Sequence, residues 1–179
     1  MIVLLPLVMI LLLLVANGLF VAAEFGLVGA PRASIEHHAS QGSRLAQRVQ
    51  RILDDPKQRS RFIATTQVGI SAASLGLGMY GENVLAGWIE HRLEPLDITR
   101  VVAAHTIASV VALTILTYFH IVIGEVVPKS VALQNPERTV LWIAPLIRAL
   151  ERALLPLVAA LNVIGNLVLR LLGVQRREA

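Results

Sequence analysis

Three stretches without Asp, Glu, Lys or Arg divide the chain into apolar and polar parts: residues 1–23, 62–81 and 101–124. Each is about as long as the roughly 20 mostly apolar residues that a helix needs to cross a bilayer. No basic segment precedes the first stretch, and its apolar run is longer than that of a signal peptide, so we expect a retained span. The pattern predicts three transmembrane helices, at about residues 2–29, 61–81 and 100–124.

The polar segment between the first two spans predicts short juxtamembrane helices at about residues 33–55. Ala46, Val49, Ile52 and Leu53 recur at helical spacing, which makes one side of such a helix apolar. Proline and charged residues interrupt the apolar C-terminal segment, about residues 137–173, which predicts a juxtamembrane belt helix on the membrane surface. A fourth span over residues 153–169 is the alternative.

Composition agrees with a membrane protein. Of the 179 residues, 55% are hydrophobic and 16% are charged, whereas a soluble domain carries about 25% charged residues. The chain has no cysteine, which excludes disulfides, thiolate metal sites and cysteine nucleophiles. The net charge of +4 does not indicate nucleic acid, because the basic residues lie beside the apolar runs. We therefore predict a single all-α membrane domain over residues 1–179.

Charge asymmetry predicts the topology. Residues 31–61 carry seven Lys and Arg, whereas residues 82–100, read as a loop, carry two. Because basic loops stay on the cytoplasmic side, we expect a multi-pass protein of the cell membrane with its N-terminus outside and its C-terminus in the cytoplasm. A fourth span would place Arg176 and Arg177 outside, against this rule, so we favour the belt helix.

The candidate chemistry begins where the third apolar run ends, at Gly124 and Glu125. Pro128 has no N–H to bond the Gly124 carbonyl and disfavours helical angles at Val127, so we expect a structural break in the helix. A carboxylate beside a free carbonyl offers the oxygen ligands that Mg²⁺ and Ca²⁺ prefer. In the alternative interpretation, Glu125 pairs with Lys129 one turn later and marks the membrane edge.

Polar residues also recur along single faces of the other spans. Gln67, Ser71, Ser74, Gly78 and Glu82 share one helical face. This face fits either close packing through small residues or the polar wall of a cavity. Asn17 and Glu24 lie seven residues apart and so share a face of the first helix. We assign His120 to the edge or the packing of the third span, since imidazole suits zinc or copper better than Mg²⁺.

Three segments together resemble the CorC / cyclin M (CNNM) family of magnesium transporters. They are Asn17-Gly-Leu-Phe-Val-Ala-Ala-Glu-Phe25, Thr65-Thr-Gln-Val-Gly-Ile-Ser-Ala-Ala-Ser-Leu-Gly76 and His120-Ile-Val-Ile-Gly-Glu-Val-Val-Pro-Lys-Ser130. The resemblance implies three spans, a cytoplasmic juxtamembrane helix, a homodimer in the lipid bilayer, and Mg²⁺ export or Mg²⁺/Na⁺ exchange. Family members usually continue into CBS modules that bind ATP, and this chain ends without them.

The resemblance also implies the residues of a Mg²⁺ site: Glu125, Gly124, Ser71, Ser74, Asn17 and Ala22. Glu125 would supply the charge, and Ser71 and the Gly124 carbonyl would supply neutral oxygens. Many relatives have serine where this chain has Val21, Ala22 and Ala23, so a ligand from this stretch would be a backbone carbonyl. The main alternative is a dimeric membrane anchor for cytoplasmic modules. We do not expect an enzyme, because the chain has no HExxH, GxSxG or cysteine.

Overall fold

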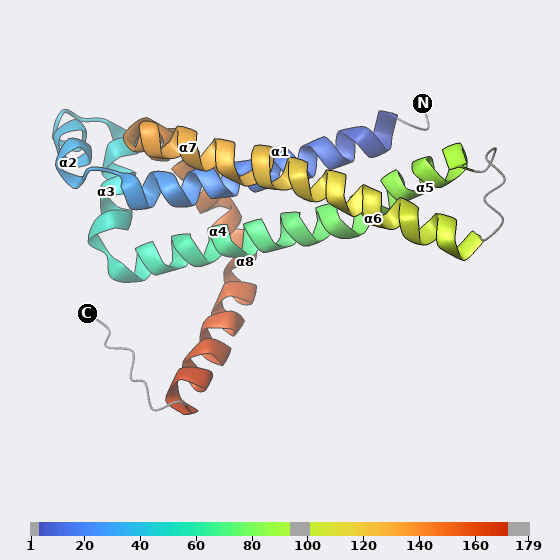
Figure 1. The fold of residues 1–179 in the computed structure, drawn as a ribbon. Coiled ribbons are helices and arrows are strands. Elements are labelled where there is room, and N and C mark those ends of the chain that lie inside the picture. Colours follow the sequence, from blue (N-terminus) through green and yellow to red (C-terminus); the bar gives the residue numbers. More distant parts are fainter. Residues whose placement is uncertain (1–3, 94–100, 172–179) are drawn as a thin grey trace. The chain divides into compact units, whose positions relative to one another are not determined.

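The computed structural model describes residues 4–93 and 101–171, and every element in these ranges is a helix (Figure 1). The elements are α1 (Leu4–Gly29), α2 (Arg32–Ser40), α3 (Arg44–Asp54), α4 (Pro56–Gly76), the π-helical turn η1 (Leu77–Gly81), α5 (Glu82–Leu93), α6 (Val101–Phe119), the π-helical turn η3 (His120–Val126), α7 (Val127–Gln134) and α8 (Pro136–Leu171). Three helical stretches are long and apolar enough to cross a membrane: Leu4–Gly29, Pro56–His91 and Thr106–Gln134. The predicted all-α class with three spans is confirmed. In the described part of the chain, α8 is not among these stretches.

The second span is longer than its uncharged run. We expected a loop after residue 81, but α4, η1 and α5 follow one another directly and the helix continues to Leu93. This expectation was wrong because the absence of charge marks the part of a helix that lipid surrounds, not the end of the helix. No proline interrupts residues 82–93, and most of them are compatible with a helix. The rest of the expected loop, residues 94–100, lies outside the described residues.

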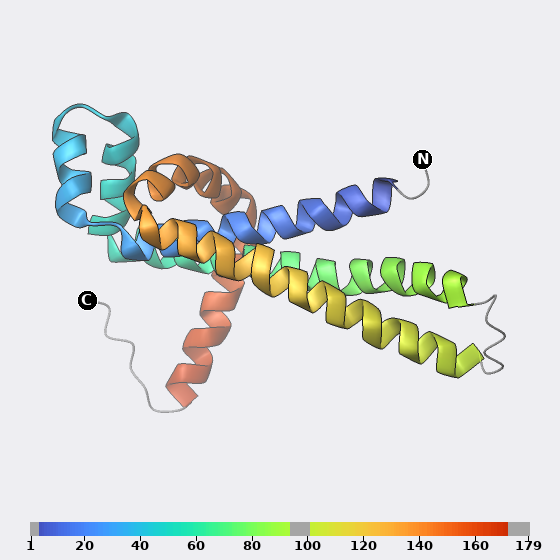
Figure 2. The same ribbon diagram turned by 45° about the horizontal axis from the view of Figure 1, so that its top comes forward.

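The chain divides into two compact units, and the first contains residues 1–21 and 69–130. Its core has one cluster of aliphatic side chains from α1, η1 and α6: Ile10, Leu14, Leu77 and Leu116. In a second cluster, Ala86 of α5 packs with Ala108 and Ala112 of α6. These small side chains let α5 and α6 lie side by side (Figure 2).

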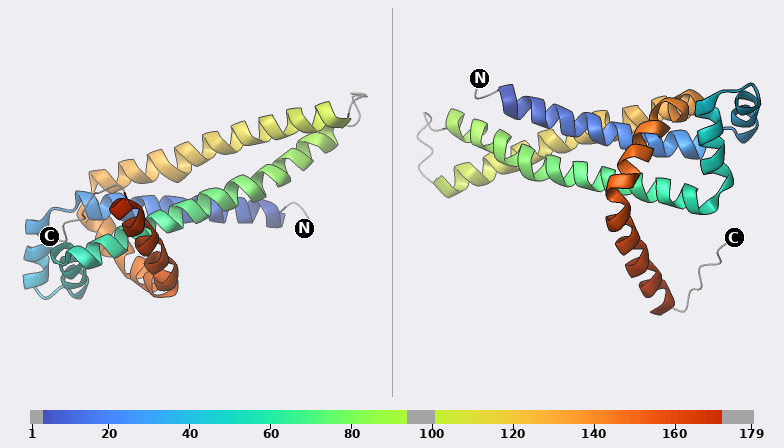
Figure 3. Two further views of the ribbon diagram at one scale, coloured as in Figure 1. Left: turned by 90° about the horizontal axis from the view of Figure 1, so that it is seen from below. Right: turned by 180° about the vertical axis from the view of Figure 1, so that it is seen from behind.

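The second unit contains residues 22–68 and 131–179. Its helices α2 and α3 form a hairpin, and Gly42 in the connection has a φ of +91°, which favours glycine. Ser43 caps α3 by accepting a hydrogen bond from the Ala46 N–H at 3.4 Å. The apolar side of α3, with Val49 and Ile52 buried, packs against α8 (Figure 3). The predicted juxtamembrane segment 33–55 is thus two helices, α2 and α3. Helix α8 contains Pro145 and Pro156 and continues through both.

Polar contacts join the helices of this second unit. The Glu137 carboxylate, at the start of α8, accepts a hydrogen bond from Ser34 Oγ and lies 2.9 Å from His38 Nδ1.

At the start of α4, the Asp55 carboxylate accepts hydrogen bonds from the Gln58 side chain and from the backbone N–H of Lys57. These bonds, that of Gln58 foremost, lower the pKa of Asp55 below its usual value. Both carboxylates stand at helix N-termini, where negative charge is stabilising.

Candidate functional site

The predicted break at Pro128 is a π-helical turn rather than a helix end. In η3 the helix widens over His120–Val126, and α7 then continues to Gln134. Val127 has φ −65° and ψ −52°, and its N–H bonds the carbonyl of Val122, five residues earlier. The prediction that Val127 leaves helical angles is therefore wrong. A π turn before the proline shifts the local hydrogen-bond register, so the chain accommodates Pro128 without ending the helix.

The Gly124 carbonyl on η3 is held by a side chain from α1. Asn17 is only 1% exposed, and its Nδ2 donates a hydrogen bond to Gly124 O at 2.9 Å. Ser74 Oγ, from α4, donates to Asn17 Oδ1 at 3.2 Å. The same hydroxyl lies 3.1 Å from His120 Nε2. Four polar groups from three helices therefore meet at the π turn, and we call Asn17, Ser74, His120 and Gly124 the π-turn cluster.

Two glycines allow this close approach. A Cβ at Gly124 would lie 3.1 Å from Asn17 Nδ2 and 3.0 Å from the His120 ring. A Cβ at Gly18, next to Asn17, would lie 2.9 Å from Pro128 Cγ. A Cβ at Gly18 would force Pro128 and α1 apart, and a Cβ at Gly124 would require the Asn17 and His120 side chains to shift by a few tenths of an ångström.

The structure brings together three of the six site residues that the sequence predicted: Asn17, Ser74 and Gly124. Glu125 follows Gly124 on η3, and its side chain is exposed. Ser71 is also exposed and makes no bond to the cluster. Ala22 belongs to the second unit and is not part of the cluster. Their roles as ligands stay predictions.

Sequence reasoning missed His120 as a member of the cluster. We had assigned it to the edge or the packing of the span on the grounds of metal preference. Its position four residues before Gly124 was the available signal, because residues that far apart share a helix face. The structure places its Nε2 within hydrogen-bonding distance of Ser74. His120 is therefore linked to Asn17 through the Ser74 hydroxyl.

The second unit holds another polar pair within the predicted spans. Gln67 on α4 hydrogen-bonds the carboxylate of Glu24 on α1. Ionisable residues inside spans are costly and are candidates for function by default. The sequence analysis had placed these two residues on polar faces without pairing them.

The donors at the π turn fit a hard cation better than a soft one. Among the described residues, no group of three or more His, Asp or Glu side chains could hold a metal ion. Besides the ring nitrogen of His120, the turn offers carbonyl, amide and hydroxyl oxygens, with one carboxylate next in sequence. Mg²⁺ and Ca²⁺ take oxygen ligands, and Mg²⁺ usually keeps several waters beside one or two carboxylates.

Fold and site together define a multi-pass membrane protein with a polar cluster at a π turn in one of its spans. The chain belongs to the family described as the cyclin M transmembrane N-terminal domain, which matches residues 7–179. The resemblance drawn from the three motifs is thereby confirmed.

Relatives in bacteria agree with this assignment. The chain is 31% identical over 169 residues to the UPF0053 protein YhdT of Bacillus subtilis (strain 168), covering 94% of this chain and 36% of the relative. It is 31% identical over 172 residues to YugS of the same organism, covering 94% and 38%. It is 27% identical over 165 residues to the UPF0053 inner membrane protein YfjD of Escherichia coli (strain K12), covering 89% and 33%. The chain thus spans well under half the length of these three relatives.

Proposed function

We propose that this domain transports Mg²⁺ across the membrane, exporting it in exchange for Na⁺, through a site at the π turn. The observation that carries the proposal is the Gly124 carbonyl, which accepts a hydrogen bond from the buried Asn17 side chain of another helix. Glu125, adjacent in sequence, supplies a negative charge. Irregular backbone with polar partners at membrane depth is tolerated only where it is buried in protein or lines a cavity.

The Asn17 amide is the switch in this mechanism. Its Nδ2 now donates a hydrogen bond to the Gly124 carbonyl, so a cation that approaches this oxygen from the side of Asn17 displaces the amide N–H. Rotating the amide by half a turn brings Oδ1 toward the carbonyl as a second ligand and turns Nδ2 toward Ser74 Oγ. A hydroxyl can accept as readily as it donates, so Ser74 keeps its bond to Asn17 in either state. Ion binding and release then need only a side-chain rotation and a small tilt of one helix.

The direct test is Mg²⁺ flux into or out of liposomes that contain the purified chain, with and without a Na⁺ gradient. We expect flux above that of empty liposomes, and an increase in the thermal stability of the protein as Mg²⁺ is added, because binding to the folded state stabilises it. Stabilisation without flux would identify a sensor or anchor and overturn transport. The absence of both effects would overturn the ion site as well.

We also propose the orientation that the loop charges predict, with the connection between α1 and α4 in the cytoplasm. Cysteines can be introduced singly, because the chain has none of its own. A cysteine at Gln41, an exposed residue in the turn between α2 and α3, should react with an impermeant reagent only from the cytoplasmic side. One at Glu94 should react only from outside. Labelling of both from one side would contradict the three-span topology.

A further inference from the structure

A basic groove of about 580 Å³ lies in the second unit between α3, the first turns of α4 and the middle of α8. Five arginines line it: Arg48, Arg51, Arg61, Arg148 and Arg152. Glu151 is the one acidic residue in the lining, so five positive charges against one negative charge leave +4. A concave surface of this charge attracts anions, and the attraction is stronger than on a flat surface because the walls exclude water.

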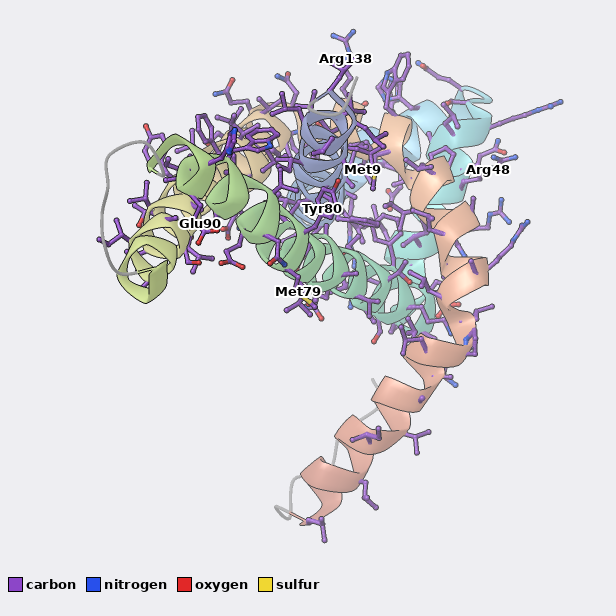
Figure 4. The ribbon with its side chains drawn as sticks, turned by 90° about the vertical axis from the view of Figure 1, so that its right-hand side faces the viewer. Met9, Arg48, Met79, Tyr80, Glu90 and Arg138 are labelled. Carbon is purple, nitrogen blue, oxygen red and sulfur yellow. The ribbon has the colours of Figure 1, made fainter. Side chains whose placement is uncertain are left out.

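Most of this positive charge has no partner inside the protein. Arg148 is held by Gln58, to which its Nη2 donates, and by Glu151, whose Oε2 lies 3.6 Å from Nη1. Glu151 is only 7% exposed, and its carboxylate lies against Arg148 rather than against the other arginines. Over the described residues, the side chains of Arg48, Arg61 and Arg152 make no hydrogen bond or ion pair. Arg48 projects from α3 in Figure 4. Three guanidinium groups are therefore available to a ligand.

The groove lies at the end of a membrane span. Arg61 directly precedes the uncharged run of residues 62–81 within the span Pro56–His91. Gln58, which also lines the groove, is three residues earlier, a rise of about 4.5 Å along the helix axis. Arginines at such a boundary stand at the level of the polar headgroups that flank the hydrocarbon core.

The lining also has an apolar part. Leu45, Ile52 and Leu155 line the groove together with the arginines. Leu155 is 40% exposed, so it offers apolar contact at the edge. A free phosphate or a nucleotide gains little from such side chains, whereas a lipid combines an anionic headgroup with hydrocarbon. The mixture of arginine and leucine favours an amphipathic anion.

We propose that the groove formed by α3, α4 and α8 binds the phosphate of an anionic membrane lipid through Arg48, Arg61 and Arg152. The planar guanidinium forms paired hydrogen bonds with phosphate oxygens, which is why arginine is preferred for such recognition. Arg148, fixed by Gln58 and Glu151, orients the wall of the groove. The bound lipid would connect α3 and α8 to the end of the second span. This site is independent of the proposed ion site.

The test measures lipid binding rather than transport. Short-chain phosphatidylglycerol, added to the purified chain in a neutral detergent, should raise the temperature of thermal unfolding. Short-chain phosphatidylcholine and inorganic phosphate at the same concentration should not. The variant Arg48→Ala/Arg152→Ala should bind phosphatidylglycerol at least tenfold more weakly. The matched control is Arg44→Ala/Arg59→Ala, which removes the same charge from α3 and α4 outside the groove, and it should bind like the parent protein.

Two results would overturn the proposal. Equal binding by the groove variant and the control would show that the arginines act only through overall charge. Equal stabilisation by inorganic phosphate would show that the ligand is a free anion and not a lipid. If the double variant fails to fold, Arg61→Gln serves instead, since Arg61 is exposed and its side chain makes no hydrogen bond or ion pair with the described residues.

Discussion

Replacing Glu125 by glutamine should reduce Mg²⁺ affinity at least tenfold and abolish measurable Mg²⁺ flux, while the domain still folds. Glutamine keeps the shape of the side chain but removes its charge. In the proposed site no second carboxylate compensates, because none of the four residues of the π-turn cluster is acidic. Bonds to a charged partner contribute about 1.5–3 kcal/mol, and each 1.4 kcal/mol corresponds to about tenfold in affinity. Calorimetry measures the affinity, and a Mg²⁺-sensitive dye in liposomes measures the flux.

The matched control for this substitution is Glu36→Gln. Glu36 is an exposed carboxylate on α2, in the other unit, and the same chemical change there should alter neither binding nor flux. Unchanged Mg²⁺ binding in Glu125→Gln would assign this residue to the membrane edge, paired with Lys129. The ion site at the π turn would then be wrong, even if the hydrogen bond from Asn17 to Gly124 is intact.

Replacing Gly69 by alanine should destabilise the domain by about 1–3 kcal/mol, the usual cost of overpacking. Gly69 on α4 is buried, and a Cβ there would overlap the ring of Phe20 on α1. For a chain of this size such a loss lowers the melting temperature by several degrees. Thermal unfolding of the purified variant in detergent measures the effect.

Two further variants show whether the loss comes from this overlap. Gly87→Ala on α5 introduces the same methyl group where no atom lies within 4 Å, and it should be neutral or stabilising because alanine favours helix. In a Phe20→Ala background the ring is gone, so Gly69→Ala should cost much less than it does alone. An equal cost in both backgrounds would contradict the close packing of α1 against α4.

The sequence predicted the fold of this chain more completely than it predicted the site. The three uncharged runs predicted the spans, and the apolar spacing of Ala46, Val49 and Ile52 predicted the buried side of α3. The ends of the spans were less accurate. Charge begins where the lipid core ends, while the helix continues as long as its backbone bonds are satisfied, as in α5.

The π turn shows a second limit of the sequence. Proline marked the correct place, but its presence alone does not distinguish a helix end from a widened turn. That choice depends on whether other groups can take the backbone carbonyls that the proline disturbs. Here Asn17 binds the Gly124 carbonyl, and the helix runs on through α7.

The sequence by itself determined that this is an all-α membrane protein of the cyclin M transmembrane family, because lipid excludes charge and because the family motifs are contiguous. Only the tertiary structure decided which polar groups meet. Asn17 and Gly124 are 107 residues apart, and Ser74 is 57 residues from Asn17. The rotation and depth of one helix against another depend on close approaches at glycines such as Gly18 and Gly124. No single helical pattern encodes these approaches, since each requires the shape of both surfaces.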